Sequence, residues 1–214
     1  MNQKFYALPQ QRQQSILNGA IRVFARYSYK KASTDEIAKS AGISKALIFH
    51  YFGSKKELYL FLYQYAETYV IQQMSALHDY AKTDFFDILA DAQICKMKIL
   101  SVYPDIMLFL MQGFFEENAE VRPAINKNFD SILADSSTRF LSRADASKFR
   151  EGITAEQALN IILWMADGFM RSRTPEKLKD LDAVNQEYLS YLNLLKRQFY
   201  RPELIEGDEN HAGN

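Results

Sequence analysis

The chain has 214 residues, of which 48% are apolar, so it is large and apolar enough to bury a substantial core. It contains a single cysteine, Cys95, which excludes an intrachain disulfide and a thiolate metal cluster and agrees with a reducing compartment. No apolar run approaches the roughly 18 residues of a membrane helix, and the first residues lack the apolar stretch of a secretory signal, so we expect a cytoplasmic protein.

The formal net charge of zero hides an uneven distribution along the chain. Residues 1–60 hold ten Lys or Arg and three Asp or Glu, a net charge of +7, so the remaining residues carry −7. A basic segment of this kind favours contact with a polyanion. The alternative is an ordinary fluctuation in the charge of helix surfaces.

The elements at the start of the chain are predicted to be helices. Helical periodicity dominates, and no strand-like alternation bounded by hairpin turns is present, so the sequence predicts an all-α fold. A first helix is expected over residues 9–27. Ser33-x-x-Glu36 is a capping-box sequence that begins a second helix, and this helix is expected to end near Gly42.

Two further helix starts follow within a few residues. Ser44 is suited to cap a third helix of about two turns over residues 45–52. Ser54-x-x-Glu57 is another capping box, and it opens a long helix that is expected to reach about Tyr80.

The rest of the chain is predicted to contain five more amphipathic helices. Residues 154–171 and 181–200 are the most apolar of these, and the first is apolar nearly all round, which indicates burial on two sides. We predict a first domain over residues 1–54, a second domain over residues 55–206 and a flexible tail over residues 207–214. The breaks between these helices are expected near Thr83, at Pro104, at residues 117–122, at residues 150–154 and at Thr174-Pro175.

Two short helices joined by a tight turn at Gly42 have the form of a helix-turn-helix. A short second helix of this kind can enter the major groove of DNA with its N-terminus first, while the first helix lies across the phosphates. Each helix start also offers unpaired backbone N–H groups and the positive end of a dipole, which suit phosphate oxygens. The pattern therefore favours DNA binding.

At this point the sequence resembles the DNA-binding domain of the tetracycline-repressor-type (TetR) regulators over residues 10–60. The resemblance implies a homodimeric transcriptional regulator, a repressor, that binds a palindromic double-stranded operator and releases it when a small effector binds. The residues that carry the resemblance are Ser33-Thr34-x-x-Ile37-Ala38, Ala41-Gly42-Ile43-Ser44-Lys45 and Phe49-x-Tyr51-Phe52-x-Ser54-Lys55-x-x-Leu58.

The resemblance also implies which residues meet DNA. Ala46-Leu47 stands where many relatives have Gly followed by a small polar residue, so base reading here is expected to use apolar contact with a thymine methyl. The residues expected to face the groove or its walls are Lys45, Leu47, His50 and Tyr51. Those expected to hold phosphates, through hydroxyls, helix starts and charge, are Ser33, Thr34, Ser44, Tyr51 and Lys55. The predicted DNA-binding residues are Ser33, Thr34, Ser44, Lys45, Ala46, Leu47, His50, Tyr51 and Lys55.

The C-terminal part is rich in Met and aromatic side chains, which are adaptable and polarizable. One interpretation is a pocket for an apolar or amphipathic effector, and the competing interpretation is ordinary core. The predicted effector-binding residues are Tyr65, Tyr69, Met97, Tyr103, Met107, Met111, Phe114 and Trp164. The predicted dimerisation residues, on the two most apolar helices, are Ile161, Met165, Phe169, Tyr188, Leu192 and Leu195.

The alternatives are an enzyme and a DNA-binding protein without a small-molecule effector. An enzyme is disfavoured because the sequence has no G-x-G-x-x-G, P-loop, G-x-S-x-G or H-E-x-x-H motif, so we predict no catalytic residues, no metal and no cofactor. A DNA-binding protein that responds to a protein partner, or that has no effector at all, stays open.

Overall fold

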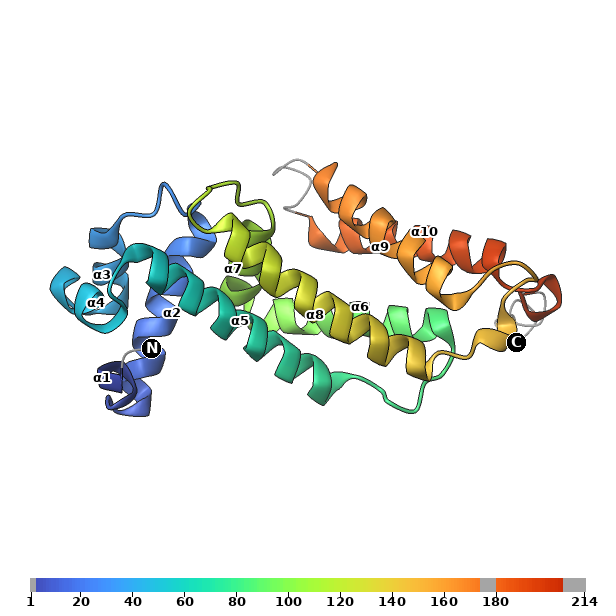
Figure 1. Cartoon of the computed structure of the whole chain (residues 1–214), viewed down its shortest axis with the longest axis horizontal. Coiled ribbons are helices and arrows are strands. Elements are labelled where there is room, and N and C mark those ends of the chain that lie inside the picture. Colours follow the sequence, from blue (N-terminus) through green and yellow to red (C-terminus); the bar gives the residue numbers. More distant parts are fainter. Residues whose placement is uncertain (1–2, 174–179, 206–214) are drawn as a thin grey trace. The chain divides into compact units, whose positions relative to one another are not determined.

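Figure 1 shows the computed structural model, which describes residues 3–173 and 180–205. In these residues the chain forms ten α-helices and one 3-10 helix and no strand, which confirms the predicted all-α fold. No described helix combines the length and apolar character that a membrane span needs. The helices are α1 (Gln3–Tyr6), α2 (Gln10–Arg26), α3 (Thr34–Ala41), α4 (Lys45–Phe52), α5 (Lys55–Leu77), α6 (Phe85–Val102), α7 (Pro104–Phe114), α8 (Arg122–Arg143), η1 (Ala146–Lys148), α9 (Ala155–Arg171) and α10 (Leu181–Phe199).

The predicted helix boundaries are close to the observed ones. The predicted third helix coincides with α4, whereas α5 ends at Leu77, three residues before the expected end. The short helices α1 and η1 were not expected, since a single turn carries no periodic signal in the sequence. The predicted break at Thr174-Pro175 and the predicted tail over residues 207–214 lie outside the described residues.

The chain divides into two compact units. Unit 1 comprises residues 1–78 and 94–133, and unit 2 comprises residues 79–93 and 134–214. Helices α6 and α8 each contribute residues to both units. Unit 1 contains α5 and α7 as well as the N-terminal helices. The domain boundary expected between residues 54 and 55 remains a prediction.

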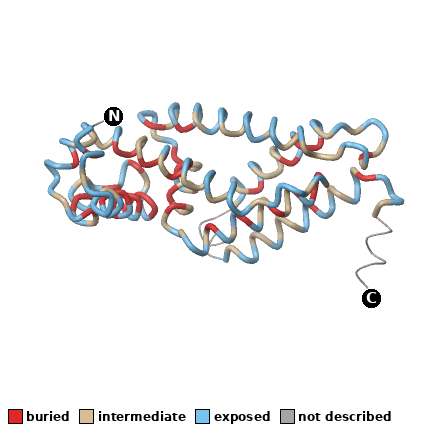
Figure 2. Tube along the Cα trace, turned by 90° about the horizontal axis from the view of Figure 1, so that it is seen from below, coloured by how far each residue is buried: buried red, intermediate tan, exposed pale blue. Residues whose placement is uncertain are grey.

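The core of unit 1 is centred on three aromatic side chains from three helices. Phe24 of α2, Tyr59 of α5 and Phe109 of α7 are each at most 1% exposed. The ring centroid of Tyr59 lies 4.9 Å from that of Phe24 and 5.3 Å from that of Phe109, both in edge-to-face geometry. Such pairs add about 0.5–1.5 kcal/mol each beyond the burial of apolar area. The cluster therefore fixes α2 and α7 against α5, and buried residues are dense in this part of the trace (Figure 2).

A glycine allows α2 and α3 to pack unusually closely. A Cβ atom on Gly19 would lie against the carbonyl oxygen of Ser40 and 2.5 Å from the Cα atom of Ala41. Ordinary carbon contacts are about 3.5–4.0 Å long, so only glycine fits at this position without moving α3. The position of the helix-turn-helix on α2 thus depends on the absence of a side chain.

Unit 2 has a separate aromatic core. Phe85 and Phe86 at the start of α6 pack on Phe149 and Tyr200, with Phe85 to Phe149 at 5.1 Å and Phe86 to Tyr200 at 5.2 Å between ring centroids. The backbone N–H of Arg150 donates to the carbonyl oxygen of Phe199 at 2.8 Å, which ties the segment before α9 to the end of α10. Helices α9 and α10 pack against each other in the same unit (Figure 1).

Candidate nucleic-acid interface

The turn between α3 and α4 is defined by its caps. Gly42 ends α3 with a φ of 65°, in the left-handed region that favours glycine. Ser44 then caps α4, because its side chain accepts a hydrogen bond from the backbone N–H of Leu47 at 3.3 Å. Arg12 of α2 donates from Nη2 to the carbonyl oxygen of Gly42 at 2.6 Å, so α2 holds the turn directly.

The predicted capping residue of α3 is correct, but its partner is not. The Ser33 side chain accepts from the backbone N–H of Asp35 at 3.2 Å, and not from Glu36 as the capping-box pattern predicted. Ser54 behaves as predicted, since its side chain accepts from the backbone N–H of Glu57 at 3.1 Å. Three capped helix starts therefore lie close together in the sequence, each with backbone N–H groups that can meet a phosphate.

Helix α4 is held to the domain by one side and exposed on the other. Ile48 is its buried residue, at 1% exposure, and it packs in the core that contains Ile37 and Ala41 of α3. Leu47 is 36% exposed, although it is large and apolar, and His50 is exposed as well. An exposed apolar side chain beside exposed polar ones is the composition that reads base edges in a major groove.

Two lysines of this surface already form contacts within the chain. Lys45 Nζ lies 2.9 Å from Asp35 Oδ2, and the two side chains are 48% and 71% exposed. Such an exposed pair contributes at most about 1 kcal/mol, so a phosphate can compete for the lysine. Lys55 Nζ lies 4.8 Å from the centroid of the Tyr29 ring and 3.4 Å from the carbonyl oxygen of Lys30. Burial lowers the pKa of Lys55, and the nearby Glu120 and Glu116 oppose that effect.

Tyr51 belongs partly to the core. Its ring packs edge-on against Phe5 of α1 at 6.1 Å and against His50 at 5.5 Å, and the side chain is half-buried. A phosphate contact by Tyr51 would therefore use the hydroxyl at the tip of a ring that also supports α4. Of the other predicted residues, Ser33, Ser44 and Ala46 are exposed and Thr34 is half-buried. All nine lie on α3, α4 or their caps and the first turn of α5.

Residues 16–61, which contain this arrangement, match the family described as "Bacterial regulatory proteins, tetR family". Residues 16–61 thus resemble the DNA-binding domain of that family, and we call them the tetR domain. The "HTH-type transcriptional repressor AcnR" of Corynebacterium efficiens is 41% identical to this chain over 54 residues, which are 25% of this chain and 29% of the relative. The chain therefore matches less than a third of the length of that relative.

Solved structures of transcriptional regulators share the fold over most of the chain. A TetR family transcriptional regulator from Chloroflexus aurantiacus aligns with a TM-score of 0.66 at 16% identity, over 94% of this chain and 98% of that one. The transcriptional regulator FadR from Bacillus subtilis, solved in complex with stearoyl-CoA, aligns with a TM-score of 0.58 at 20% identity, over 84% and 96% of the two chains. At these identities the likeness concerns the fold.

The predicted effector residues are only partly brought together. Tyr69 packs on Tyr65 and Tyr103, with ring centroids 6.3 Å and 5.0 Å apart. The Tyr65 hydroxyl lies 3.3 Å from Oε1 of Gln14, so it reaches α2 of the tetR domain. Trp164 is 72% exposed on α9, on the surface of unit 2. The remaining predicted residues, all half-buried, are Met97, Met107, Met111 and Phe114. Their role stays a prediction.

A cavity of about 670 Å³ lies elsewhere in unit 1. Parts of α1, α4, α5 and α8 line it, and none of the predicted effector residues is among the lining residues. Sequence reasoning missed this cavity because its walls come from residues that are up to 123 positions apart in the chain, from Phe5 to Asn128. The aromatic run of α4 is the one signal that pointed towards it.

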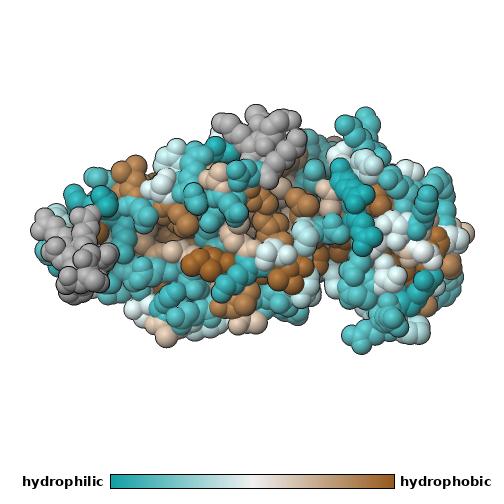
Figure 3. Space-filling view, turned by 180° about the vertical axis from the view of Figure 1, so that it is seen from behind, coloured by the Kyte–Doolittle hydropathy of each residue, from teal (hydrophilic) through white to brown (hydrophobic). Residues whose placement is uncertain are grey.

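The predicted dimerisation residues fall into two groups. Phe169 and Leu192 are buried in unit 2, at 8% and 3% exposure, and Leu192 belongs to the aromatic core of that unit. Met165, Tyr188 and Leu195 are half-buried and pack on the same core. Figure 3 shows that brown, apolar side chains reach the surface among polar ones on the face in view. On α9 and α10 the exposed large apolar residues are Ile161, Trp164, Tyr191 and Leu194.

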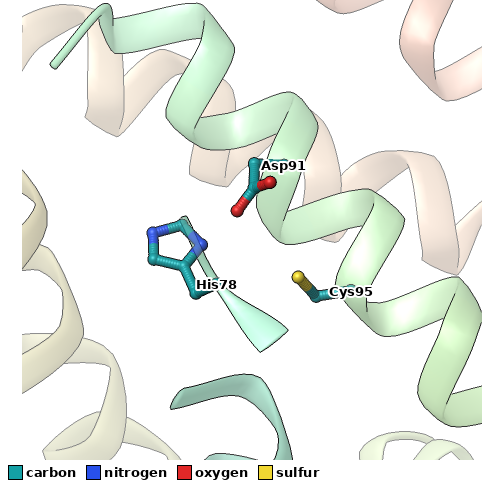
Figure 4. Close-up of side chains that lie close together, drawn as sticks. All are labelled: His78, Asp91 and Cys95. Atoms are coloured by element: carbon teal, nitrogen blue, oxygen red, sulfur yellow. The ribbon is translucent and has the colours of Figure 1, made fainter. Parts of the chain in front are cut away.

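One group of side chains has the composition of a metal site. Figure 4 shows His78, Asp91 and Cys95, whose possible ligand atoms all lie within 4.8 Å of one another. The Asp91 carboxylate already accepts from Lys82 Nζ at 3.0 Å and from the backbone N–H of Asp79 at 3.1 Å. A metal ion would have to displace the lysine ammonium group. The carboxylate therefore has a structural role in the segment between α5 and α6.

Proposed function

We propose that this chain is a homodimeric, sequence-specific DNA-binding repressor of transcription that acts in the cytoplasm. The observation that carries the proposal is the placement of α4. Ile48 packs one side of this helix into the core, and Leu47 and His50 are exposed elsewhere on the helix surface. Three capped helix starts lie close by in the sequence. A helix that is held in this way can enter the major groove while the caps meet phosphates.

The matched relatives support a role in the regulation of transcription. AcnR is named as a repressor, whereas FasR of Mycolicibacterium smegmatis, 41% identical over 64 residues, is named as an activator. Regulation by DNA binding, and not catalysis, is accordingly the activity we assign. The N-terminal charge of +7 in residues 1–60 is in keeping with a polyanionic partner.

The proposed dimer follows from the exposed apolar side chains of α9 and α10. Ile161, Trp164, Tyr191 and Leu194 are between 40% and 72% exposed, and large apolar residues that gather on neighbouring helices favour a partner surface. Two copies related by a two-fold axis would present two α4 helices to successive major grooves about 34 Å apart. A palindromic operator is the expected target.

The proposed signal is a small apolar or amphipathic effector. The half-buried Met and aromatic residues of α6 and α7 offer adaptable apolar surface, and FadR from Bacillus subtilis, which shares the fold, was solved with stearoyl-CoA. An effector that fits only when α5 is displaced would move α4, because a short link at Gly53 joins the two helices. Operator affinity would then fall.

Selection of duplex DNA by the purified protein tests this function. We expect one enriched palindromic sequence, bound with an affinity that falls steeply with salt concentration as counterions are released. Thermal unfolding with stearoyl-CoA, aromatic compounds and small polar metabolites then tests the effector. Stabilisation by the polar compounds alone would contradict an apolar effector, and stabilisation by none of them would favour a regulator without an effector.

A further inference from the structure

The cavity of unit 1 lies apart from the predicted effector residues, none of which lines it. Its volume of about 670 Å³ falls within the range of about 300–1,000 Å³ that is typical of sites for drug-sized molecules. Its lining comes from unit 1 alone, so its shape depends on helices that pack together in one body. The chemistry of the lining then decides what kind of molecule fits.

The apolar wall of the cavity is aromatic. The Phe5, Phe52 and Phe61 rings form a cluster with centroids 5.0 Å apart for Phe5 and Phe52, 5.4 Å for Phe52 and Phe61, and 5.8 Å for Phe5 and Phe61. Phe49 of α4 also lines the cavity and is 41% exposed, although it is large and apolar. Flat ring faces and edges favour a flat aromatic ligand.

The polar part of the lining is rich in acceptors. Glu57 is the acidic residue of the lining, and no Lys or Arg is among the described residues that line the cavity. The Glu57 carboxyl carbon lies 3.2 Å from the position that a Cβ atom on Gly53 would occupy, at the junction of α4 and α5. Asn128 donates from Nδ2 to Glu67 Oε2 at 3.1 Å, which leaves its carbonyl oxygen as an acceptor.

We propose that this cavity binds a flat aromatic organic cation and that such binding weakens the hold on DNA. At the short range of the lining, a carboxylate and aromatic rings without a lysine or arginine attract a cation and repel an anion, and this local effect opposes the net positive charge of residues 1–60. His50 and Tyr51 line the cavity and are also predicted DNA contacts, so a ligand there touches the helix that reads the operator. The coupling to DNA rests on the proposed function, whereas the binding itself does not.

Two xanthene dyes of opposite charge provide the first test. Rhodamine 6G is cationic and fluorescein is anionic, and the two share a flat ring system. Fluorescence anisotropy of each dye, titrated with the full chain in the absence of DNA, should show saturable binding of rhodamine 6G at one site per chain and much weaker binding of fluorescein. Equal binding of the two dyes, or no saturable binding of rhodamine 6G, would overturn the proposal.

Three variants locate the site. Phe49→Ala should weaken rhodamine 6G binding about tenfold by removing an aromatic wall, and Glu57→Gln should weaken it about threefold to fivefold, since Glu57 is exposed and partly screened. Phe129→Ala is the matched control, because Phe129 is a 44% exposed aromatic residue next to Asn128 that does not line the cavity. Circular dichroism confirms that each variant is folded. If Phe49→Ala and Glu57→Gln both bind the dye like the control, the dye binds elsewhere.

A second titration separates this proposal from the proposed function. Rhodamine 6G is added to the protein bound to its selected duplex, with the free duplex as a control for dye bound to DNA. We expect release of the duplex at dye concentrations that saturate the cavity. Dye binding without any DNA binding would contradict the proposed function alone. DNA binding that is unchanged when the dye saturates the cavity would contradict the coupling alone.

Discussion

Gly19→Ala sets two opposing effects against each other in the contact between α2 and α3. Alanine favours the helical state by about 1 kcal/mol relative to glycine, so α2 by itself would become more stable. The new Cβ atom, however, would lie 2.5 Å from the Cα atom and 2.6 Å from the backbone nitrogen of Ala41, and still closer to the carbonyl oxygen of Ser40. Backbone atoms cannot rotate away, so α3 must move by about 1 Å to restore a contact of about 3.5 Å.

The displacement should outweigh the gain in helix propensity. Overpacking of a tight contact costs about 1–3 kcal/mol, and we expect the upper end because the obstacle is backbone. The net loss should be about 2 kcal/mol in the free energy of unfolding, which corresponds to about 4–8 °C in melting temperature for a chain of this length. Since α3 carries α4 with it, the affinity for the operator should fall in the folded variant as well.

Urea unfolding followed by circular dichroism, at one fixed protein concentration, measures the effect. Asn18→Ala is the control, because Asn18 is the exposed neighbour of Gly19 in the same helix and its side chain only accepts a hydrogen bond from Gln14 at 2.9 Å. The control should stay within about 0.5 kcal/mol of the natural protein. A Gly19→Ala protein as stable as the control would refute the close packing of α2 on α3.

The remaining predictions concern DNA reading, a buried acid and the dimer. Leu47→Ala should change which DNA sequences the protein prefers. Tyr51→Phe keeps the ring packing and removes the hydroxyl, so it should lower the affinity for all duplexes alike. Anisotropy on a set of base-substituted operators measures both, and identical behaviour of the two variants would count against this assignment. Burial raises the pKa of Glu67, although the hydrogen bond from Asn128 opposes it. The Glu67 carboxyl group therefore keeps its proton to a higher pH in the folded state than in the unfolded state. The free energy of unfolding thus falls as the pH rises above about 4.3 towards the folded-state pKa. Glu67→Gln should thus be more stable than the natural protein at pH 7.5, with a difference that vanishes below about pH 4 in urea titrations, and a constant difference at all pH values would disprove this origin. Trp164→Ala should shift sedimentation towards the monomer while leaving the secondary structure intact, and an unchanged sedimentation coefficient would exclude this face as the dimer contact.

Local signals in the sequence were sufficient for the tetR domain. Ser44 and Ser54 cap helices in the structure as the pattern predicted, and the bounds of α4 agree residue by residue. Caps and turns depend on side chains within a few positions of the backbone that they bind, so they can be read from one sequence. The partner of Ser33 differs because a neighbouring backbone N–H two residues on is also within reach.

Surfaces formed by distant parts of the chain could not be read in the same way. The apolar pattern of residues 154–171 predicted a helix buried on two sides, but periodicity does not say which side packs within the chain. In the structure Phe169 is in the core of unit 2 and Trp164 is exposed. The cavity of unit 1 was likewise hidden, since its lining joins Phe5 to Asn128 through four helices.

The central claim is that α4 reads a DNA sequence. Anisotropy titrations from low to physiological salt, with the selected duplex and a scrambled duplex of the same length and composition, test it most directly. At physiological salt the selected duplex should bind at least about a thousandfold more tightly than the scrambled one, as specific protein–DNA complexes do. Equal affinity for the two duplexes, over the full range of these salt concentrations, would contradict it.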